Sequence, residues 1–183
     1  MKFGAVPVDQ AKGAILAHSM KLSEGRLRKG LVLEPAHLEA LKASGEDEVI
    51  VARLEADDVH EDAAAQALAK ALAEGAEGVH LTTPFTGRVN VIADGPGVVL
   101  LDEARVHAAN MVDPMITVAT VAPLHQLAAG GMAATVKMIS YAVPEGQLAQ
   151  AVEAGLGAIR FARPVHQTAS LILPDIPGSP GDK

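Results

Sequence analysis

The stretch RVNVIADGPGVVLL, residues 88–101, decides the fold class of this chain. Two apolar runs rich in β-branched residues flank Asp94-Gly95-Pro96-Gly97, and this combination predicts two strands joined by a turn. The same patterns predict further strands at 3–8, 13–22, 26–33, 48–54, 79–83, 116–121, 133–140 and 168–173, and helices at 34–44, 61–75, 103–112 and 144–156. The irregular spacing of these elements predicts an α+β fold with mixed or antiparallel sheets and short helices, not a doubly wound parallel sheet.

The order of the elements is compatible with two subdomains. Residues 1–57 carry their own strand-helix-strand pattern, and residues 58–173 hold the remaining helices and strands. The last segment, 174–183, has three Pro and two Gly in ten residues. Because that composition is typical of linkers, we expect residues 174–183 to be a flexible tail or linker, and the chain to be the N-terminal region of a larger protein.

Composition excludes several classes of protein. The 183 residues carry 15 Lys and Arg against 22 Asp and Glu, a net charge of −7, which weighs against a nucleic-acid partner. A hydrophobic share of 49% excludes a disordered chain. No Cys is present, so disulfides and thiolate metal sites are excluded. No apolar run approaches the roughly 20 residues that span a bilayer, and we expect a cytoplasmic protein with no membrane partner.

The densest basic cluster is GRLRKG, residues 25–30. In a strand, Arg26 and Arg28 would point to one face, where two guanidinium groups could bind a phosphate by bidentate hydrogen bonds. The competing interpretation is a solvated hairpin, in which the charges keep an edge strand soluble.

The segment TTPFTGRVN, residues 82–90, is a second candidate for binding an anion. Its threonines supply hydroxyl groups, Gly87 allows a ligand to approach the backbone, and Arg88 supplies positive charge. The segment lacks the signature of a phosphate-binding loop, and an ordinary turn before a strand would look the same.

No catalytic constellation is identified, so the sequence leaves open whether the chain is an enzyme. None of the seven His forms a metal-binding or hydrolase motif. His60, among four nearby acidic residues, comes closest to a metal site. However, an acidic helix N-terminus that complements the helix dipole, capped by Asp58, explains the same pattern, and no metal ligand is predicted.

The segment ATVKMI, residues 134–139, is similar to the Lys-Met motif of biotinyl carriers, but Val136 stands where carriers have Met. A strand with one exposed lysine explains the segment equally well. Lys137 is retained as a candidate binding residue because of its charge.

Three stretches resemble proteins of molybdenum cofactor biosynthesis. Residues 26–54, RLRKGLVLEPAHLEALKASGEDEVIVARL, resemble a segment of molybdopterin molybdenum-insertion proteins. Residues 85–121 and 130–144 resemble the N-terminal half of bacterial molybdopterin-binding proteins. The resemblance covers most of residues 1–173. The chain departs from the family in lacking the glycine-rich loop that holds the pterin phosphate, so no active-site residue can be transferred from the family.

The resemblance implies a non-catalytic role in the biosynthesis or binding of molybdopterin. The expected ligand is a pterin or another anionic small molecule, and the expected binding residues are Arg26, Arg28, Arg88 and Lys137. The alternative is a self-association or interaction module without a small-molecule site. The Ala-rich segment 63–73 supports that alternative, because small side chains allow helices to pack closely, and it would make the protein a homo-oligomer.

Overall fold

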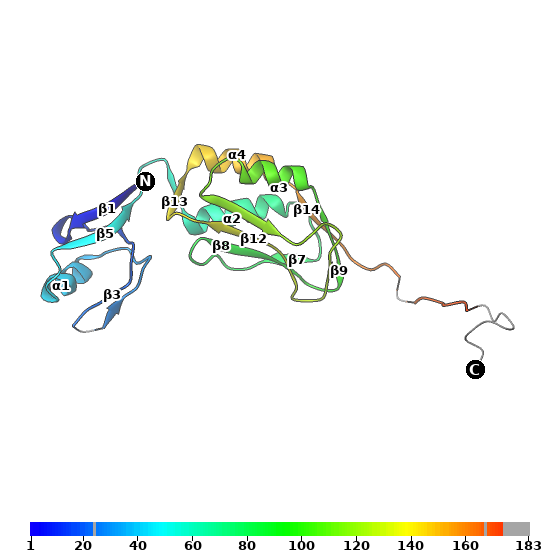
Figure 1. The fold of residues 1–183 in the computed structure, drawn as a ribbon, viewed down its shortest axis with the longest axis horizontal. Coiled ribbons are helices and arrows are strands. Elements are labelled where there is room, and N and C mark those ends of the chain that lie inside the picture. Colours follow the sequence, from blue (N-terminus) through cyan, green and yellow to red (C-terminus); the bar gives the residue numbers. More distant parts are fainter. Residues whose placement is uncertain (24, 167, 174–183) are drawn as a thin grey trace, which may run out of the picture.

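A computed structural model describes residues 1–23, 25–166 and 168–173, and these residues form two units joined by a short linker (Figure 1). In the first unit, β5 pairs antiparallel with β1 on one side and β2 on the other, and β3 pairs with β4 in a separate hairpin. The elements of this unit are β1 (Lys2–Pro7), η1 (Val8–Gln10), β2 (Ile15–Leu16), β3 (Met20–Lys21), β4 (Arg26–Leu27), α1 (Pro35–Ala43) and β5 (Glu48–Arg53).

Helix α1 closes the core of the first unit. Pro35 occupies its first turn, where the missing N–H costs nothing, and the His37 ring accepts a hydrogen bond of 3.0 Å from the Glu34 N–H. Leu41 is fully buried against Val49 and Val51 of β5. This small core is separate from the core of the second unit.

The second unit carries four antiparallel strands in the order β10-β12-β8-β7, next to a three-stranded sheet β11-β9-β14 and the pair β13-β6. Its elements are β6 (Asp58–His60), α2 (Glu61–Leu72), β7 (Val79–Leu81), β8 (Arg88–Ala93), β9 (Gly97–Leu101), α3 (Glu103–Asn110), β10 (Ile116–Thr120), β11 (Gln126–Leu127), β12 (Met132–Met138), β13 (Ala142–Pro144), α4 (Glu145–Gly155) and β14 (Ile159–Ala162).

Helix α2 covers one face of the four-stranded sheet. Its residues Ala64, Ala65 and Leu68 are fully buried in one cluster with Val89 of β8 and Val136 of β12. Alternate residues of β8 and β12 are only partly buried, because successive side chains of a strand point to opposite faces. The sheet therefore has a helix-covered apolar face and a second face that carries polar and charged side chains.

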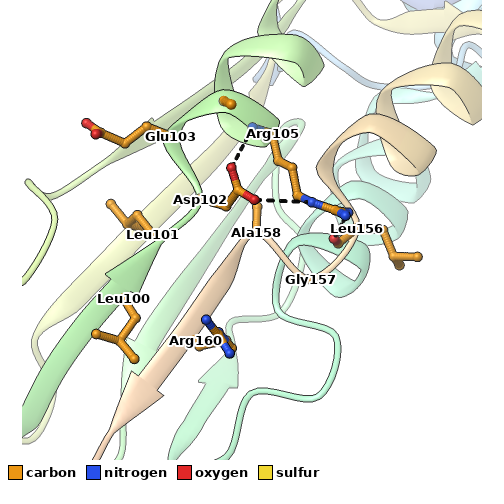
Figure 2. A pocket seen from close by; sticks show the side chains of 10 residues that line it. Leu100, Leu101, Asp102, Glu103, Arg105, Leu156, Gly157, Ala158 and Arg160 are labelled. Carbon is orange, nitrogen blue, oxygen red and sulfur yellow. Dashed lines mark hydrogen bonds and ion pairs between the residues drawn. The ribbon is translucent and has the colours of Figure 1, made fainter.

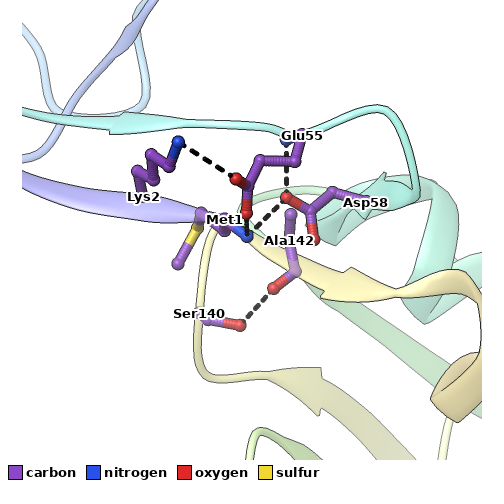
Figure 3. Close-up of polar contacts among 6 residues, drawn as sticks. All are labelled: Met1, Lys2, Glu55, Asp58, Ser140 and Ala142. Atoms are coloured by element: carbon purple, nitrogen blue, oxygen red, sulfur yellow. Dashed lines mark hydrogen bonds and ion pairs between the residues drawn. The ribbon is translucent and has the colours of Figure 1, made fainter.

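Polar contacts connect the two units (Figure 3). The Met1 α-ammonium lies 2.9 Å from Glu55 Oε2 and 2.7 Å from Asp58 Oδ2, so it joins the start of β1 to both ends of the linker. Its hydrogen bonds to Asp58 and Glu55 raise the pKa of the ammonium. The Tyr141 hydroxyl donates a hydrogen bond of 2.7 Å to the Ala17 carbonyl.

The expected α+β class is confirmed, and every sheet pairing among the described residues is antiparallel. The four predicted helices are present, each within a few residues of its expected ends. No helix in the described part of the chain is long and apolar enough to cross a membrane.

The predicted strands at 13–22, 26–33 and 168–173 are wrong in extent or in kind. Residues 13–22 contain the two short strands β2 and β3, and 26–33 contains only β4 before a turn at Gly30. Residues 168–173 form no strand, whereas β14, β6, β13 and β11 were missed. The predicted tail, 174–183, lies outside the described residues.

Candidate functional site

The tight turn between Phe85 and Arg88 lies at the centre of the candidate site. The two residues exchange backbone hydrogen bonds of 3.1 Å each, and Thr86 and Gly87 between them have φ of +49° and +70°. Two positive φ values are what type I′ hairpin turns require, and glycine adopts them freely. A β-branched residue rarely does, so Thr86 is held in a strained conformation.

Three neighbours fix this turn in place. Asp62 of α2 accepts a hydrogen bond of 2.6 Å from the Gly87 N–H through Oδ1. The Met138 N–H donates to the Gly87 carbonyl at 2.8 Å, and the Lys137 ammonium donates to the Thr86 carbonyl. The strain at Thr86 is therefore compensated by contacts from α2 and β12.

Glu61, the first residue of α2, is a buried carboxylic acid beside the turn. The residue is 8% exposed, and its Oε2 atom lies 3.8 Å from Lys137 Nζ. A methyl group on Gly87 would lie 2.7 Å from the same oxygen, so only glycine leaves room for this carboxyl group. Burial raises the pKa of the Glu61 carboxyl, while the positive charge of Lys137 acts in the opposite direction.

Tyr141 stands next to Glu61. The Glu61 N–H donates a hydrogen bond of 2.9 Å to the Tyr141 carbonyl, and the Tyr141 hydroxyl is partly buried against the first unit through Ala17. Burial, and then the negative charge of Glu61, raise the pKa of the Tyr141 hydroxyl. Perturbed acidic groups at the junction of two units are a frequent feature of functional sites.

Two of the four predicted binding residues meet at this site. The antiparallel register pairs Arg88 of β8 with Lys137 of β12, and Lys137 with Thr117 of β10. The three residues therefore form one row on the sheet face that α2 does not cover. The Arg88 residue is exposed, and the Lys137 side chain is 28% exposed.

Arg26 and Arg28 lie elsewhere, in the hairpin region of the first unit. Strand β4 ends at Leu27, so the expected placement of both arginines on one face of a strand is wrong. A tight turn stops the strand, since Gly30 has a φ of +84° and its N–H bonds the Leu16 carbonyl. Lys29 of the same segment lies close enough for its charge to lower the pKa of Glu61 slightly.

Glu61 is the residue that sequence reasoning missed. Its neighbour His60 is the actual N-cap of α2, and its Nδ1 accepts a hydrogen bond of 3.3 Å from the Asp62 N–H, in place of the predicted cap Asp58. Within the described residues, no group of three or more His, Asp or Glu could hold a metal ion. The signal for Glu61 was present but weak, because a helix first turn is a common place for acidic residues.

A separate cavity of about 810 Å³ lies between β9, β14 and the loop after α4 (Figure 2). Arg105 spans it, with a hydrogen bond of 2.7 Å from Nη1 to the Leu156 carbonyl and an ion pair of 3.3 Å from Nε to Asp102. Acidic and basic groups are balanced in this cavity, and none of the residues around the Thr86–Gly87 turn lines it.

Comparison with known proteins yields one match. A family model described as a domain of unknown function (DUF8806) matches residues 5–53, which form most of the first unit and less than half of the chain. No curated protein matches the chain. No solved structure matches it either.

Proposed function

We propose that the chain takes part in molybdenum cofactor biosynthesis as a non-catalytic region that binds a phosphorylated pterin beside the Thr86–Gly87 turn. The observation that carries the proposal is the juxtaposition of Arg88 and Lys137 in register, next to the buried carboxyl group of Glu61. The sequence resemblance supplies the pterin, and the proposal includes the cytoplasmic location expected from the sequence.

The two cations suit the phosphate end of such a ligand. A guanidinium group binds two phosphate oxygens at once, and a lysine ammonium adds a point charge. The hydroxyl group of Thr117 in the same row supplies a further hydrogen-bond donor. Lys137 already contacts Glu61 and the Thr86 carbonyl, so its ammonium is held beside the turn rather than free in solution.

The carboxyl group of Glu61, 3.8 Å from the Lys137 ammonium, suits N–H donors of the ligand. The aminopyrimidinone edge of a pterin presents adjacent N–H donors, and a carboxylate accepts two parallel hydrogen bonds from such a pair. Glu61 is a carboxyl group in a poorly hydrated position, where each hydrogen bond is stronger than in water.

Fluorescence titration tests the proposal. Pterins fluoresce, and the chain has no Trp and a single Tyr, so the protein background is low. A pterin with a phosphomethyl group should bind the intact chain, with lower affinity at higher salt. Glu61→Gln and the double variant Arg88→Gln/Lys137→Gln should each weaken binding at least about tenfold, which corresponds to about 1.4 kcal/mol.

The matched control is Lys70→Gln/Arg163→Gln, which removes one lysine and one arginine from exposed positions away from the turn. The control should leave the affinity within about twofold, because both charges lie away from the turn and solvent and salt screen such distant charges. Equal affinities for all four proteins would reject the pterin site.

The other two interpretations receive less support from the geometry. Three alanines of α2, Ala64, Ala65 and Ala69, pack within the chain, whereas Ala63 and Ala67 are exposed, so only part of the Ala-rich segment is left for contact with another copy. Lys137 is the sixth residue of the seven-residue strand β12, and its ammonium is engaged by Thr86 and Glu61. A carrier lysine instead needs a freely exposed side chain for modification.

A further inference from the structure

We infer that a second anion site lies in the cleft between the two units, and that it takes a small organic phosphate. The cleft has a volume of about 440 Å³, within the range of small-molecule sites. Its walls come from the loop after η1, the end of β5 and the end of β6. The lining residues are Gln10, Lys12, Gly13, Ala14, Ile15, Val32, Arg53, Leu54 and His60.

The charge of the cleft is of one sign. Lys12, Arg53 and His60 are the titratable groups in its lining, and all three are basic types. This is notable in a chain with a net charge of −7. Among the described residues, neither Lys12 nor Arg53 forms an ion pair, so both charges remain available to a ligand.

Two of the three acidic residues between the cleft residues Leu54 and His60 are paired with cations. These two are Glu55 and Asp58, and both contact the Met1 ammonium. The third, Asp57, forms no ion pair among the described residues. Lys2, whose Nζ lies 3.4 Å from Glu55 Oε1, adds a second cation. Two of the three negative charges are therefore matched by two positive ones, and the two positive charges of Lys12 and Arg53 outnumber the one that is left, on Asp57.

His60 supplies a directional donor. Its Nδ1 atom accepts the hydrogen bond from the Asp62 N–H, so in the neutral ring the proton is on Nε2. The three basic side chains come from three different segments, two in the first unit and one in the second. A bound phosphate would therefore bridge the units and favour their observed arrangement.

The apolar part of the lining indicates an organic phosphate rather than inorganic phosphate. Ile15 and Ala14 form a buried floor, and Val32 and Leu54 are 49% and 37% exposed at its margin. An inorganic ion would leave these aliphatic groups in water, whereas an attached organic group would cover them.

Isothermal titration of the intact chain at low salt, with AMP and with inorganic phosphate as probes, tests this inference. AMP should bind, and it should bind at least about fivefold more tightly than phosphate. Lys12→Gln/Arg53→Gln should weaken AMP binding at least tenfold, and His60→Ala should weaken it less. The matched control Lys21→Gln/Arg163→Gln removes the same types of charge from exposed positions outside the cleft and should change little.

The outcomes separate this site from the proposed pterin site. Loss of AMP binding in Lys12→Gln/Arg53→Gln, with full binding in Arg88→Gln/Lys137→Gln, supports the cleft. The opposite pattern overturns the inference, because AMP then binds beside the Thr86–Gly87 turn. Absence of AMP binding to the parent chain also overturns it. Circular dichroism confirms that each variant is folded, and the single variant Lys12→Gln, at an exposed position, repeats the test if the double variant unfolds.

Discussion

Arg88 and Lys137 face each other across the ladder of β8 and β12, two like charges in direct register. Like charges directly opposite each other destabilise a sheet. Lys137 is already paired with Glu61, whereas Arg88 forms no ion pair within the part of the chain that the structure describes. We therefore expect Arg88→Thr to raise the free energy of unfolding by about 0.2–1 kcal/mol while it weakens ligand binding. Urea denaturation measures the first effect. Arg88→Lys keeps the repulsion and is the control, and equal stabilisation by both variants would contradict the explanation.

Gly87→Ala should be strongly destabilising. The backbone has a φ of +70°, and the new methyl group would lie 2.7 Å from Glu61 Oε2 and 3.0 Å from the Met138 carbonyl oxygen. Strain and overpacking together predict a loss of about 2–4 kcal/mol in the free energy of unfolding. Gly95→Ala is the control, since Gly95 has no positive φ and no atom within 4 Å of a Cβ. A similar loss for the two variants in thermal unfolding would show that the turn does not constrain residue 87.

Thr86→Asn should be stabilising. Asparagine tolerates the left-handed conformation that threonine resists, so the variant should gain about 1 kcal/mol in the free energy of unfolding. The Lys137 contact uses the backbone carbonyl of residue 86, and the substitution leaves it intact. Urea denaturation checks the gain. Thr83→Asn, in the same loop at a residue without positive φ, should give no comparable gain.

Most of the fold could be predicted from the sequence, because its main signals are local. Alternation in β8 and the Asp94–Gly97 turn mark two strands, although β8 and β9 belong to different sheets and do not pair with each other. Leu68 and Leu72 mark the buried face of α2 as their spacing predicts. Strands β6, β11 and β13 have only two or three residues each, too few to show a period. They form because they pair with strands that are distant along the chain, and the sequence of one short segment does not reveal its pairing partner.

The candidate site was only half predictable for the same reason. Arg88 and Lys137 were chosen for charge, and their proximity depends on the register of β8 against β12, 49 positions apart along the chain. Glu61 looks like an ordinary acidic residue of a helix first turn. The Glu61 carboxyl is buried because the Gly87 backbone and the Lys137 side chain lie against it. Its burial therefore depends on tertiary contacts, which the local sequence does not show.

Glu61→Gln should change the pH dependence of stability. Burial, opposed by the charge of Lys137, leaves the pKa of the folded Glu61 carboxyl above its value in the unfolded chain. Between these two pKa values the folded state binds more protons, so this group makes the protein less stable as pH rises through that interval. The Glu61→Gln variant has no carboxyl group at this position and therefore lacks this loss of stability. Its free energy of unfolding relative to the parent should rise with pH through the interval and then level off.

Urea denaturation at several pH values measures this difference, and Glu153→Gln, at an exposed position on α4, corrects for the change in net charge. A relative stability of Glu61→Gln that falls as pH rises would mean that the Lys137 pair, not burial, dominates at Glu61.

Tyr141→Phe should loosen the contact between the two units. The variant removes the hydroxyl donor to the Ala17 carbonyl, a hydrogen bond of 2.7 Å that spans 124 positions, and should lower the free energy of unfolding by about 0.5–1.5 kcal/mol. Ser140→Ala is the matched control, since it removes a hydrogen bond of 2.6 Å to the Ala142 carbonyl within the second unit (Figure 3). Tyr141 is the only tyrosine and the chain has no Trp, so far-ultraviolet circular dichroism follows the unfolding.

Hydrogen exchange then distinguishes a local effect from one on the junction. The Ala17 N–H, which donates to the Ile50 carbonyl at 2.9 Å, should exchange faster in Tyr141→Phe and remain unchanged in Ser140→Ala. Among the described residues, the Tyr141 hydroxyl makes the sole side-chain hydrogen bond from the segment β12–β13 to the first unit. Its loss should therefore increase exchange in β2 and β5 before it increases exchange in α2. Equal exchange at Ala17 in both variants would mean that the Met1 ion pairs alone hold the units together.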